Sequence, residues 1–446
     1  MENKLTSGSV LKNLIVFSIP YLLSYFLQTL YGMADLFIIG QFDGVASTTS
    51  VSVGSQIMHM LTVVIVGLAM GTTVSVAQDV GGSNKKQAER DIGNTVTLFM
   101  VVSVAFMIGL LLLVNQIVAV MSVPAEAVKG TVIYLTVCFA GIPFITAYNI
   151  ISSIFRGLGD SRSPMYFIAV ACVANIVLDY FFMGAMHLGP AGAGLGTTIS
   201  QAFSVLISLT VILKKRSFSL NRNDFKPVRK VMGKLLKIGI PVAMQDGLIQ
   251  VAFIIITIIA NQRGLNEAAA VGIVEKIMSF LFLVPSSMLS AVSALGAQNI
   301  GAGKKERALQ TLKYAVILAT GFGIVVSVII QFTAGPLVGL FTDIHTADGA
   351  EVVRFGEQYL RGYIFDCIFA GVHFCFSGYF CACGKSVLSF IHNILAITLV
   401  RVPGVYLTSK LFPSTLFPMG LATAAGSLLS VIICCIAFHL LRLKEA

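Results

Sequence analysis

The feature that most constrains this chain is a series of long apolar runs, each long enough to cross a lipid bilayer as a helix. A transmembrane helix needs about 20 consecutive, mostly apolar residues, and the sequence contains about twelve such runs. No stretch between two runs exceeds about 25 residues, which is too short to bury a core of its own. The approximate ranges are 14–39, 51–77, 93–121, 131–155, 164–186, 192–213, 237–261, 269–297, 311–341, 357–383, 386–409 and 417–441. We therefore expect an all-α membrane protein with about twelve transmembrane helices.

Composition agrees with this class, because 56% of the 446 residues are hydrophobic and only 11% are charged. Soluble domains carry roughly 25% charged residues. The first run is longer than the core of a secretory signal, contains Asp35 and is not followed by a small-residue cleavage site. We expect it to remain in the mature protein as a transmembrane helix.

The basic residues predict the orientation, since Lys and Arg of short loops stay on the cytoplasmic side. Placing the amino terminus inside puts most of the 30 Lys and Arg residues on the cytoplasmic face, including the segment 214–237. The net charge of +10 is then explained by orientation and by contact with anionic membrane lipid. We expect both termini in the cytoplasm of a multi-pass protein of the cytoplasmic membrane, and no nucleic-acid partner.

One phrase occurs twice, as "AQDVGGSNKKQAER" from Ala77 and as "AQNIGAGKKERA" from Ala297, about 220 residues apart. Three further pairs have a similar offset: "FSIPYLLS" and "IGIPVAMQ", "FRGLGDSRSPM" and "FCACGKSVLSF", and "GLGTTIS" and "GLATAAG". The repeats predict a duplicated six-helix unit, with bundles at 1–213 and 237–446 joined by a basic cytoplasmic linker at 214–236. Because six is even, both copies enter the membrane in the same direction, and we expect a pseudo-symmetric pair with a central cleft.

These residues resemble the multidrug and toxic compound extrusion (MATE) family of secondary transporters. The resemblance rests on the duplicated halves, an early proline in spans one and seven, "MADLFIIG" in span one, the repeated Ala-Gln-x-x-Gly loop, "FRGLGDSRSPM" after span four and "NIVLDYFFMG" in span five. It implies an antiporter that uses inward flow of H⁺ or Na⁺ to export amphipathic, mainly cationic organic compounds. Such a protein would confer drug resistance.

Ionisable residues inside the apolar runs are the candidates for the coupling site, because a charge in hydrocarbon is costly and usually marks a pathway. Counted at 1.5 Å per residue, Asp35 and Asp179 lie at similar depth in the outer part of the bilayer. Asn175 shares a helical face with Asp179, and Thr197 falls at comparable depth. Such oxygen-rich groups suit either Na⁺ or a shared proton. The alternative is that these side chains only hydrogen-bond neighbouring helices.

The resemblance supports this grouping, because Asp35, Asn175, Asp179 and Thr197 match the polar positions of the family's amino-terminal cation site. Asn149 and Ser152 in span four are candidate neighbours. We expect no other metal site and no cofactor.

The second half carries a different set of polar residues in its spans, which could serve the substrate or form ion pairs with one another. With the first-half aspartates they give five acids and two bases, an excess that favours a cationic substrate. Carboxylates of the sodium-coupled branch do not align cleanly here, since Gln250 and Ala370 lie near those positions. We therefore do not expect a sodium site in this half. The candidate residues are Asp246, Gln250, Glu275, Lys276, Asp366 and Arg401.

We expect a monomeric transporter of small organic cations. One alternative is a flippase for lipid-linked oligosaccharide of the same superfamily, which should show a basic cleft for pyrophosphate. A second is an intramembrane enzyme, for which the sequence contains no His-Glu-x-x-His or Gly-x-Ser-x-Gly motif. Its one Gly-x-Gly-Asp, at residues 157–160, follows span four in a short polar loop and lies outside the apolar runs. The sequence also contains no phosphate-binding Gly-x-x-x-x-Gly-Lys motif. We therefore expect neither catalysis nor ATP use.

Overall fold

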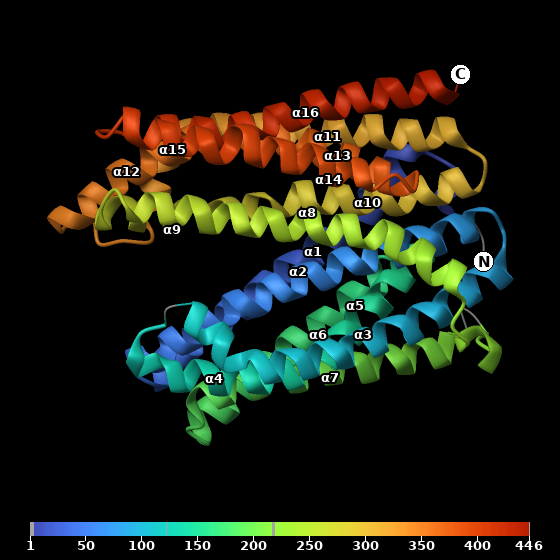
Figure 1. The fold of residues 1–446 in the computed structure, drawn as a ribbon, viewed down its shortest axis with the longest axis horizontal. Coiled ribbons are helices and arrows are strands. Elements are labelled where there is room, and N and C mark those ends of the chain that lie inside the picture. The colour runs from blue at the N-terminus through green and yellow to red at the C-terminus, as the bar shows by residue number, and fades with distance from the viewer. Residues whose placement is uncertain (1–3, 122, 216–218, 446) are drawn as a thin grey trace. The chain divides into compact units, whose positions relative to one another are not determined.

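The computed structural model describes residues 4–121, 123–215 and 219–445, and this part of the chain folds into helices without a β strand (Figure 1). The amino-terminal half contains η1 Lys4–Thr6, α1 Val10–Phe42, α2 Val45–Gly81, α3 Lys85–Val120, α4 Ala125–Ala140, α5 Ile142–Gly157, α6 Arg162–Asp179, the π-helical η2 Tyr180–Ala185 and α7 Gly189–Lys215. The carboxy-terminal half contains η3 Arg222–Phe225, α8 Arg229–Asn261, α9 Leu265–Leu281, α10 Leu283–Gly301, α11 Lys305–Gly339, α12 Ala347–Tyr363, α13 Asp366–Ala382, α14 Val387–Ala396, the π-helical η4 Ile397–Arg401, α15 Val402–Leu411 and α16 Phe417–Glu445.

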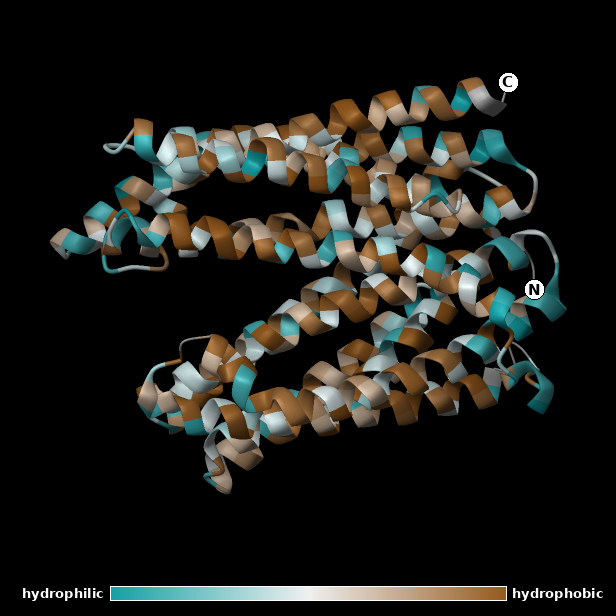
Figure 2. Cartoon of the chain, in the orientation of Figure 1, coloured by the Kyte–Doolittle hydropathy of each residue, from teal (hydrophilic) through white to brown (hydrophobic). Residues whose placement is uncertain are grey.

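The described residues hold ten helices that are long and apolar enough to cross a membrane, or twelve if each of two bent pairs forms one span. The bent pairs are α4 with α5, at 48°, and α12 with α13, at 41°. Gly141 and Pro143 explain the first break, since α5 begins directly after this glycine and carries the proline in its first turn. Apolar residues cover the length of the helices, and polar residues gather at their ends (Figure 2). The predicted all-α membrane protein with about twelve spans is confirmed.

Two compact units make up the chain. Unit 1 consists mainly of residues 19–243, and unit 2 consists mainly of residues 7–18, 244–300 and 304–445. The first residues of α1 thus pack with unit 2, and the first part of α8 packs with unit 1. These units are defined by packing, whereas the domain boundaries expected from the repeats stay a prediction.

The repeated Ala-Gln phrase forms the same turn in both copies. Ser83 and Gly303 adopt left-handed backbone conformations, with φ of 58° and 73°. In the first copy the amide of Asn84 donates to the carbonyl of Asp79 at 2.8 Å, and in the second the amide of Lys304 donates to Asn299 at 2.8 Å. Each turn ends one helix and starts the next, so the phrase recurs because each half of the chain needs this reversal.

The second repeated pair also forms one kind of turn. Gly159 in "FRGLGD" has φ of 91°, and Gly384 in "FCACGK" has φ of 69°. A backbone hydrogen bond spans five residues in both, from Asp160 to Phe155 at 2.9 Å and from Lys385 to Phe380 at 2.8 Å. Helix pairing is repeated as well: α3 packs on α5 as α11 packs on α13, and α4 packs on α7 as α12 packs on α16.

The segment after α7 is bound to α3 within unit 1. Asn94 of α3 donates to the carbonyl of Asp224 at 3.0 Å and accepts from the amide of Val228 at 2.7 Å. Glu89 accepts from the amide and the hydroxyl of Ser219, both at 3.0 Å. Helix α8 begins at Arg229, earlier than the predicted start of its span at 237. Part of the predicted linker is therefore helical, and residues 216–218 of it lie outside the described residues.

Candidate functional site

Asp35 and Thr197 meet inside unit 1. Asp35 lies in the second half of α1, and Thr197 lies two turns into α7. The Thr197 hydroxyl donates to Asp35 Oδ2 at 3.1 Å. Only 2% of Asp35 is exposed, so this carboxylate is removed from bulk solvent. A buried carboxylate inside a membrane span is expected to bind a cation or a proton.

Asp179 and Asn175 come from α6 and lie at the same place. Both are buried, and Asp179 is the last α-helical residue before the π-helical η2. Local π-helical turns are frequent at functional sites. A Cβ atom added to Gly196 of α7 would collide with Asp179 Oδ1 and lie within 3.5 Å of Asn175 Nδ2. The small residue at position 196 therefore makes the room that the Asp179 carboxylate occupies.

These side chains leave several polar atoms without a hydrogen-bond partner. Asp35 Oδ1, both carboxylate oxygens of Asp179 and both amide atoms of Asn175 are buried and unpaired within the described residues. The two carboxyl groups and the Asn175 amide lie within electrostatic range of one another. Buried polar groups are nearly always paired, so buried oxygens grouped in one place without protein partners form a set that can bind a cation or share a proton. The oxygen-only donor set fits a hard monovalent cation or a shared proton.

The two candidate neighbours in α5 are buried but are not bonded to the carboxylates. Asn149 donates to the carbonyl of Ile145 in its own helix at 2.8 Å. Ser152 Oγ is buried and has no partner in the described chain. Neither side chain forms a described hydrogen bond to Asp35 or Asp179.

Tyr31 and Gln201 are two polar neighbours of the site that the sequence analysis missed. Tyr31 interacts with Asp35 and with Gln201, and Gln201 Oε1 is buried without a partner in the described chain. Tyr31 precedes Asp35 by four residues, and Gln201 follows Thr197 by four. Residues four apart share a helical face, so this spacing was the available signal.

The polar centre of unit 2 is arranged differently. Arg401 Nη2 donates to Asp366 Oδ2 at 2.9 Å and to Ser427 Oγ at 2.8 Å. Asp366 is fully buried and Arg401 is 8% exposed. Glu275 accepts from the Thr257 hydroxyl at 3.3 Å. The charge of Asp366 is therefore neutralised by a buried arginine.

The remaining second-half candidates do not join that pair. Lys276 lies within electrostatic range of Glu275, but no ion pair joins the two. Asp246 and Gln250 are half-buried in α8, and neither forms a side-chain hydrogen bond or ion pair with a described residue. The structure thus does not bring the six second-half residues into one site.

A buried histidine pair also lies in unit 2, and the sequence analysis did not select it. His392 is hydrogen-bonded to Ser377 Oγ at 2.8 Å and to Ser430 Oγ at 3.2 Å. The rings of His373 and His392 are 5.4 Å apart. Both side chains lie in apolar helices, where a single histidine gives no sequence signal for a partner.

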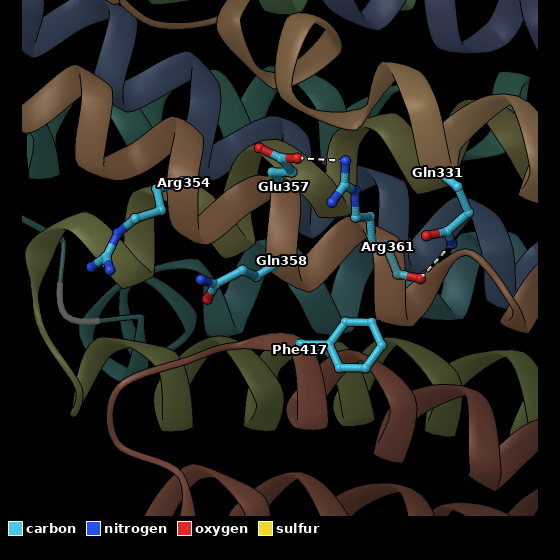
Figure 3. Close-up of a pocket in the computed structure, with 6 residues that line it drawn as sticks. All are labelled: Gln331, Arg354, Glu357, Gln358, Arg361 and Phe417. Carbon is cyan, nitrogen blue, oxygen red and sulfur yellow. Dashed lines mark hydrogen bonds and ion pairs between the residues drawn. The ribbon is translucent and has the colours of Figure 1, made fainter.

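A cavity of about 430 Å³ lies in unit 2 on α12 (Figure 3). Figure 3 shows the ion pair between Arg361 and Glu357, at 2.7 Å, and the hydrogen bond from Gln331 to the Arg361 carbonyl. None of the predicted site residues lines this cavity. Its charged groups are partly exposed and already paired, unlike the carboxylates of unit 1. The lining residues are Gln331, Arg354, Glu357, Gln358, Arg361 and Phe417.

Solved structures share this fold. A MATE protein crystallised in complex with MaL6 superposes with a TM-score of 0.92, at 22% identity over 99% of both chains. An outward-facing multidrug resistance MATE family transporter of the MOP superfamily gives 0.91, at 22% identity over 99% of this chain and 98% of that one. At this level of identity the similarity supports the fold alone.

Two curated relatives are similar in sequence over most of their length. The probable multidrug resistance protein YpnP of Bacillus subtilis is 29% identical over 94% of this chain and 92% of its own. The multidrug export protein MepA of Staphylococcus aureus MSSA476 is 25% identical over 91% of this chain and 89% of its own. The MatE family model matches residues 20–181 and 241–407, once in each half of the chain. The chain therefore belongs to the MatE family, as the resemblance of its motifs predicted.

Proposed function

We propose that the protein is a cation-coupled multidrug antiporter that exports amphipathic, mainly cationic organic compounds by alternating access. The observation that carries the proposal is the group of unpaired, buried oxygens of Asp35, Asp179 and Asn175. Curated relatives named as multidrug resistance or export proteins support the substrate class.

The coupling step follows from the chemistry of two buried carboxylates. Two negative charges in one low-dielectric site repel each other, so binding one H⁺ or Na⁺ lowers their cost of burial. The Thr197 hydroxyl and the Asn175 amide supply further polar contacts for the bound ion. One monovalent ion moving down a gradient equivalent to 100 mV supplies about 2.3 kcal/mol, which supports roughly a 50-fold substrate gradient. When one monovalent cationic substrate leaves for each ion that enters, no net charge crosses the membrane, so the concentration gradient of the ion supplies this energy.

The proposal includes a monomer in the cytoplasmic membrane with both termini in the cytoplasm. Single cysteines at Ser83 and Ser219, in a cysteine-free background, test this orientation with a membrane-impermeant thiol reagent on intact cells. We expect both positions to resist labelling and a cysteine at Asp343, in the loop between α11 and α12, to be labelled. The reverse pattern would overturn the orientation.

The function is tested by reconstituting the purified protein in liposomes loaded with a fluorescent organic cation. A pH gradient and a sodium gradient are applied separately, with an ionophore that collapses each gradient as the control. We expect efflux driven by at least one gradient and lost when it is collapsed. Efflux that ignores both gradients, or transport of a pyrophosphate-linked lipid instead of the cation, would contradict the proposal.

A further inference from the structure

Unit 1 contains a buried arginine that takes no part in the proposed coupling step. Arg156 is near the end of α5, in the repeated phrase that precedes the turn at Gly159, and only 9% of it is exposed. Its guanidinium carbon lies 4.2 Å from the centroid of the Tyr21 ring. Tyr25 and Tyr148 are also within electrostatic range. The positive charge is thus enclosed by aromatic side chains.

Arg156 differs from the other buried arginine of a span, Arg401, in lacking an acidic partner. The described residues contain no carboxylate that forms an ion pair with Arg156, and the groups that act on its charge are the three tyrosines. Cation–π contact compensates only part of the cost of burying a charge. Because burying the Arg156 charge without an acidic partner costs stability, we expect this charge to have a function.

Two tyrosines, Tyr148, which is buried, and Tyr31, which is half-buried, lie between Arg156 and the carboxylate site. Tyr148 is within electrostatic range of Arg156, and Tyr31 is within range of both Tyr148 and Asp35. Tyr21 precedes Asp35 by fourteen residues in α1, which corresponds to about 21 Å along a helix. A proton or small cation that left the site toward the end of unit 1 that bears the Gly159 turn would therefore approach this positive charge.

We propose that Arg156 is an electrostatic barrier that prevents the coupling cation from leaking past the Asp35 site without transport. A fixed arginine excludes protons and cations from a polar passage because its charge repels them where little water screens it. The tyrosine shell holds the guanidinium in place and keeps water from screening it. This inference rests on the proposed function, since it assigns a direction of leakage to the coupling ion.

The test measures ion leak in liposomes in the absence of any organic substrate. Entry of protons is followed with a trapped pH dye, and entry of sodium is followed with a radioactive tracer. Arg156→Gln and Arg156→Met remove the charge, and Arg156→Met retains an apolar stem against Tyr21. Arg156→Lys is the matched control that keeps the charge. We expect about a tenfold or larger rise in leak for Gln and Met and a leak close to wild type for Lys.

A second comparison links the leak to the carboxylate site. Adding Asp35→Asn to Arg156→Met should suppress the extra leak, because the cation no longer enters the passage through Asp35. Removal of an unpaired buried charge favours folding, so Arg156→Met should elute like wild type in size-exclusion chromatography.

Either of two results would refute the barrier. The first is an ion leak in Arg156→Gln and Arg156→Met no faster than in wild type, and the second is a leak in Arg156→Lys as fast as in those two variants. A wild-type protein without gradient-driven efflux would instead refute the proposed function. The two failures are distinguishable because the leak measurement needs no substrate.

Discussion

The two units share a fold but treat their buried charges in opposite ways. In unit 1, Asp35 and Asp179 keep carboxylate oxygens without partners and form no ion pair with a described residue, whereas in unit 2 Asp366 is paired through Oδ2 with Arg401 at 2.9 Å and only its Oδ1 lacks a partner. A buried acid paired with an arginine has little capacity left for a mobile cation, because its charge is already compensated. The capacity of a buried acid to bind a coupling ion thus depends on the groups around it, and the mere presence of an acid in a span does not establish that capacity.

The repeats show where the two copies diverged. Counted from the turn glycines Gly159 and Gly384, Asp179 corresponds to Gly404, and counted from Gly194 and Gly420, Gly196 corresponds to Ala422. In unit 1, Gly196 makes room for the Asp179 side chain. In unit 2, a Cβ atom added to Gly404 would lie 3.2 Å from the Cβ atom of Ala422. Each unit thus pairs a glycine with a larger residue at this contact. The glycine is at position 196 in unit 1, whereas in unit 2 it is at position 404, which corresponds to Asp179. Counted from the two prolines, Asp35 corresponds to Ile256, a residue of the unit 2 core.

The largest effect on coupling is expected for Asp35→Asn. The substitution keeps the shape and removes the charge, so the protein should fold and insert while coupling is lost. The roughly 50-fold substrate gradient that an ion gradient equivalent to 100 mV supports should be lost. Gradient-driven efflux in liposomes at matched protein amounts measures this. Asp43→Asn, at an exposed acid just after α1, is the control and should transport normally. Wild-type coupling in Asp35→Asn would remove this carboxylate from the site.

Asp179→Asn should impair coupling as severely as Asp35→Asn. Because both changes break one site, the double variant should be scarcely worse than either single variant. The measurement is efflux rate against external pH and sodium for the three proteins. Independent, additive losses would show that the two carboxylates serve separate steps.

The acid in unit 2 should respond through stability instead. Asp366→Asn leaves Arg401 buried without its counter-charge, a defect that costs about 3–5 kcal/mol in buried pairs. We expect lower yield and a lower midpoint of thermal unfolding in detergent, with the ion dependence of efflux intact. Asp366→Leu combined with Arg401→Met should recover most of the stability. An Asp366 variant that loses its ion dependence, beside an Asp179 variant that keeps it, would move the coupling site to unit 2.

The space at position 196 allows a milder test. Gly196→Ala places a methyl group where Asp179 Oδ1 lies, so the carboxylate must shift although its charge remains. Overpacking of this kind costs about 1–3 kcal/mol, and we expect weaker coupling without complete loss. Ala422→Gly, the reciprocal change in unit 2, is the control and should leave the ion dependence of efflux unchanged. Equal coupling in Gly196→Ala and wild type would show that the site tolerates displacement of Asp179.

The sequence predicted the helical membrane class and both turn phrases because these depend on local composition and on glycine positions. It selected Asp35 and Asp179 because an acid in an apolar run is conspicuous. Tyr31 and Gln201 were missed, since Tyr and Gln in a helix have many ordinary roles. The ion pair between residues 366 and 401 could not be predicted either, because the two are 35 positions apart in the sequence and only the folded structure brings them together. The early start of α8 at Arg229 was hidden because charged residues in its first turns resemble a loop.

The smallest expected effect compares the two copies of the Ala-Gln turn. Ser83 and Gly303 hold equivalent left-handed conformations, which cost a residue with a side chain roughly 1–2 kcal/mol and cost glycine little. Ser83→Gly should therefore raise the midpoint of thermal unfolding by about 2 °C, and Gly303→Ser should lower it by a similar amount. Both positions are exposed and a Cβ on Gly303 meets no atom within 4 Å, so packing contributes nothing. Transport should be unchanged in both variants. Shifts of the same sign would show that the two turns are not conformationally equivalent.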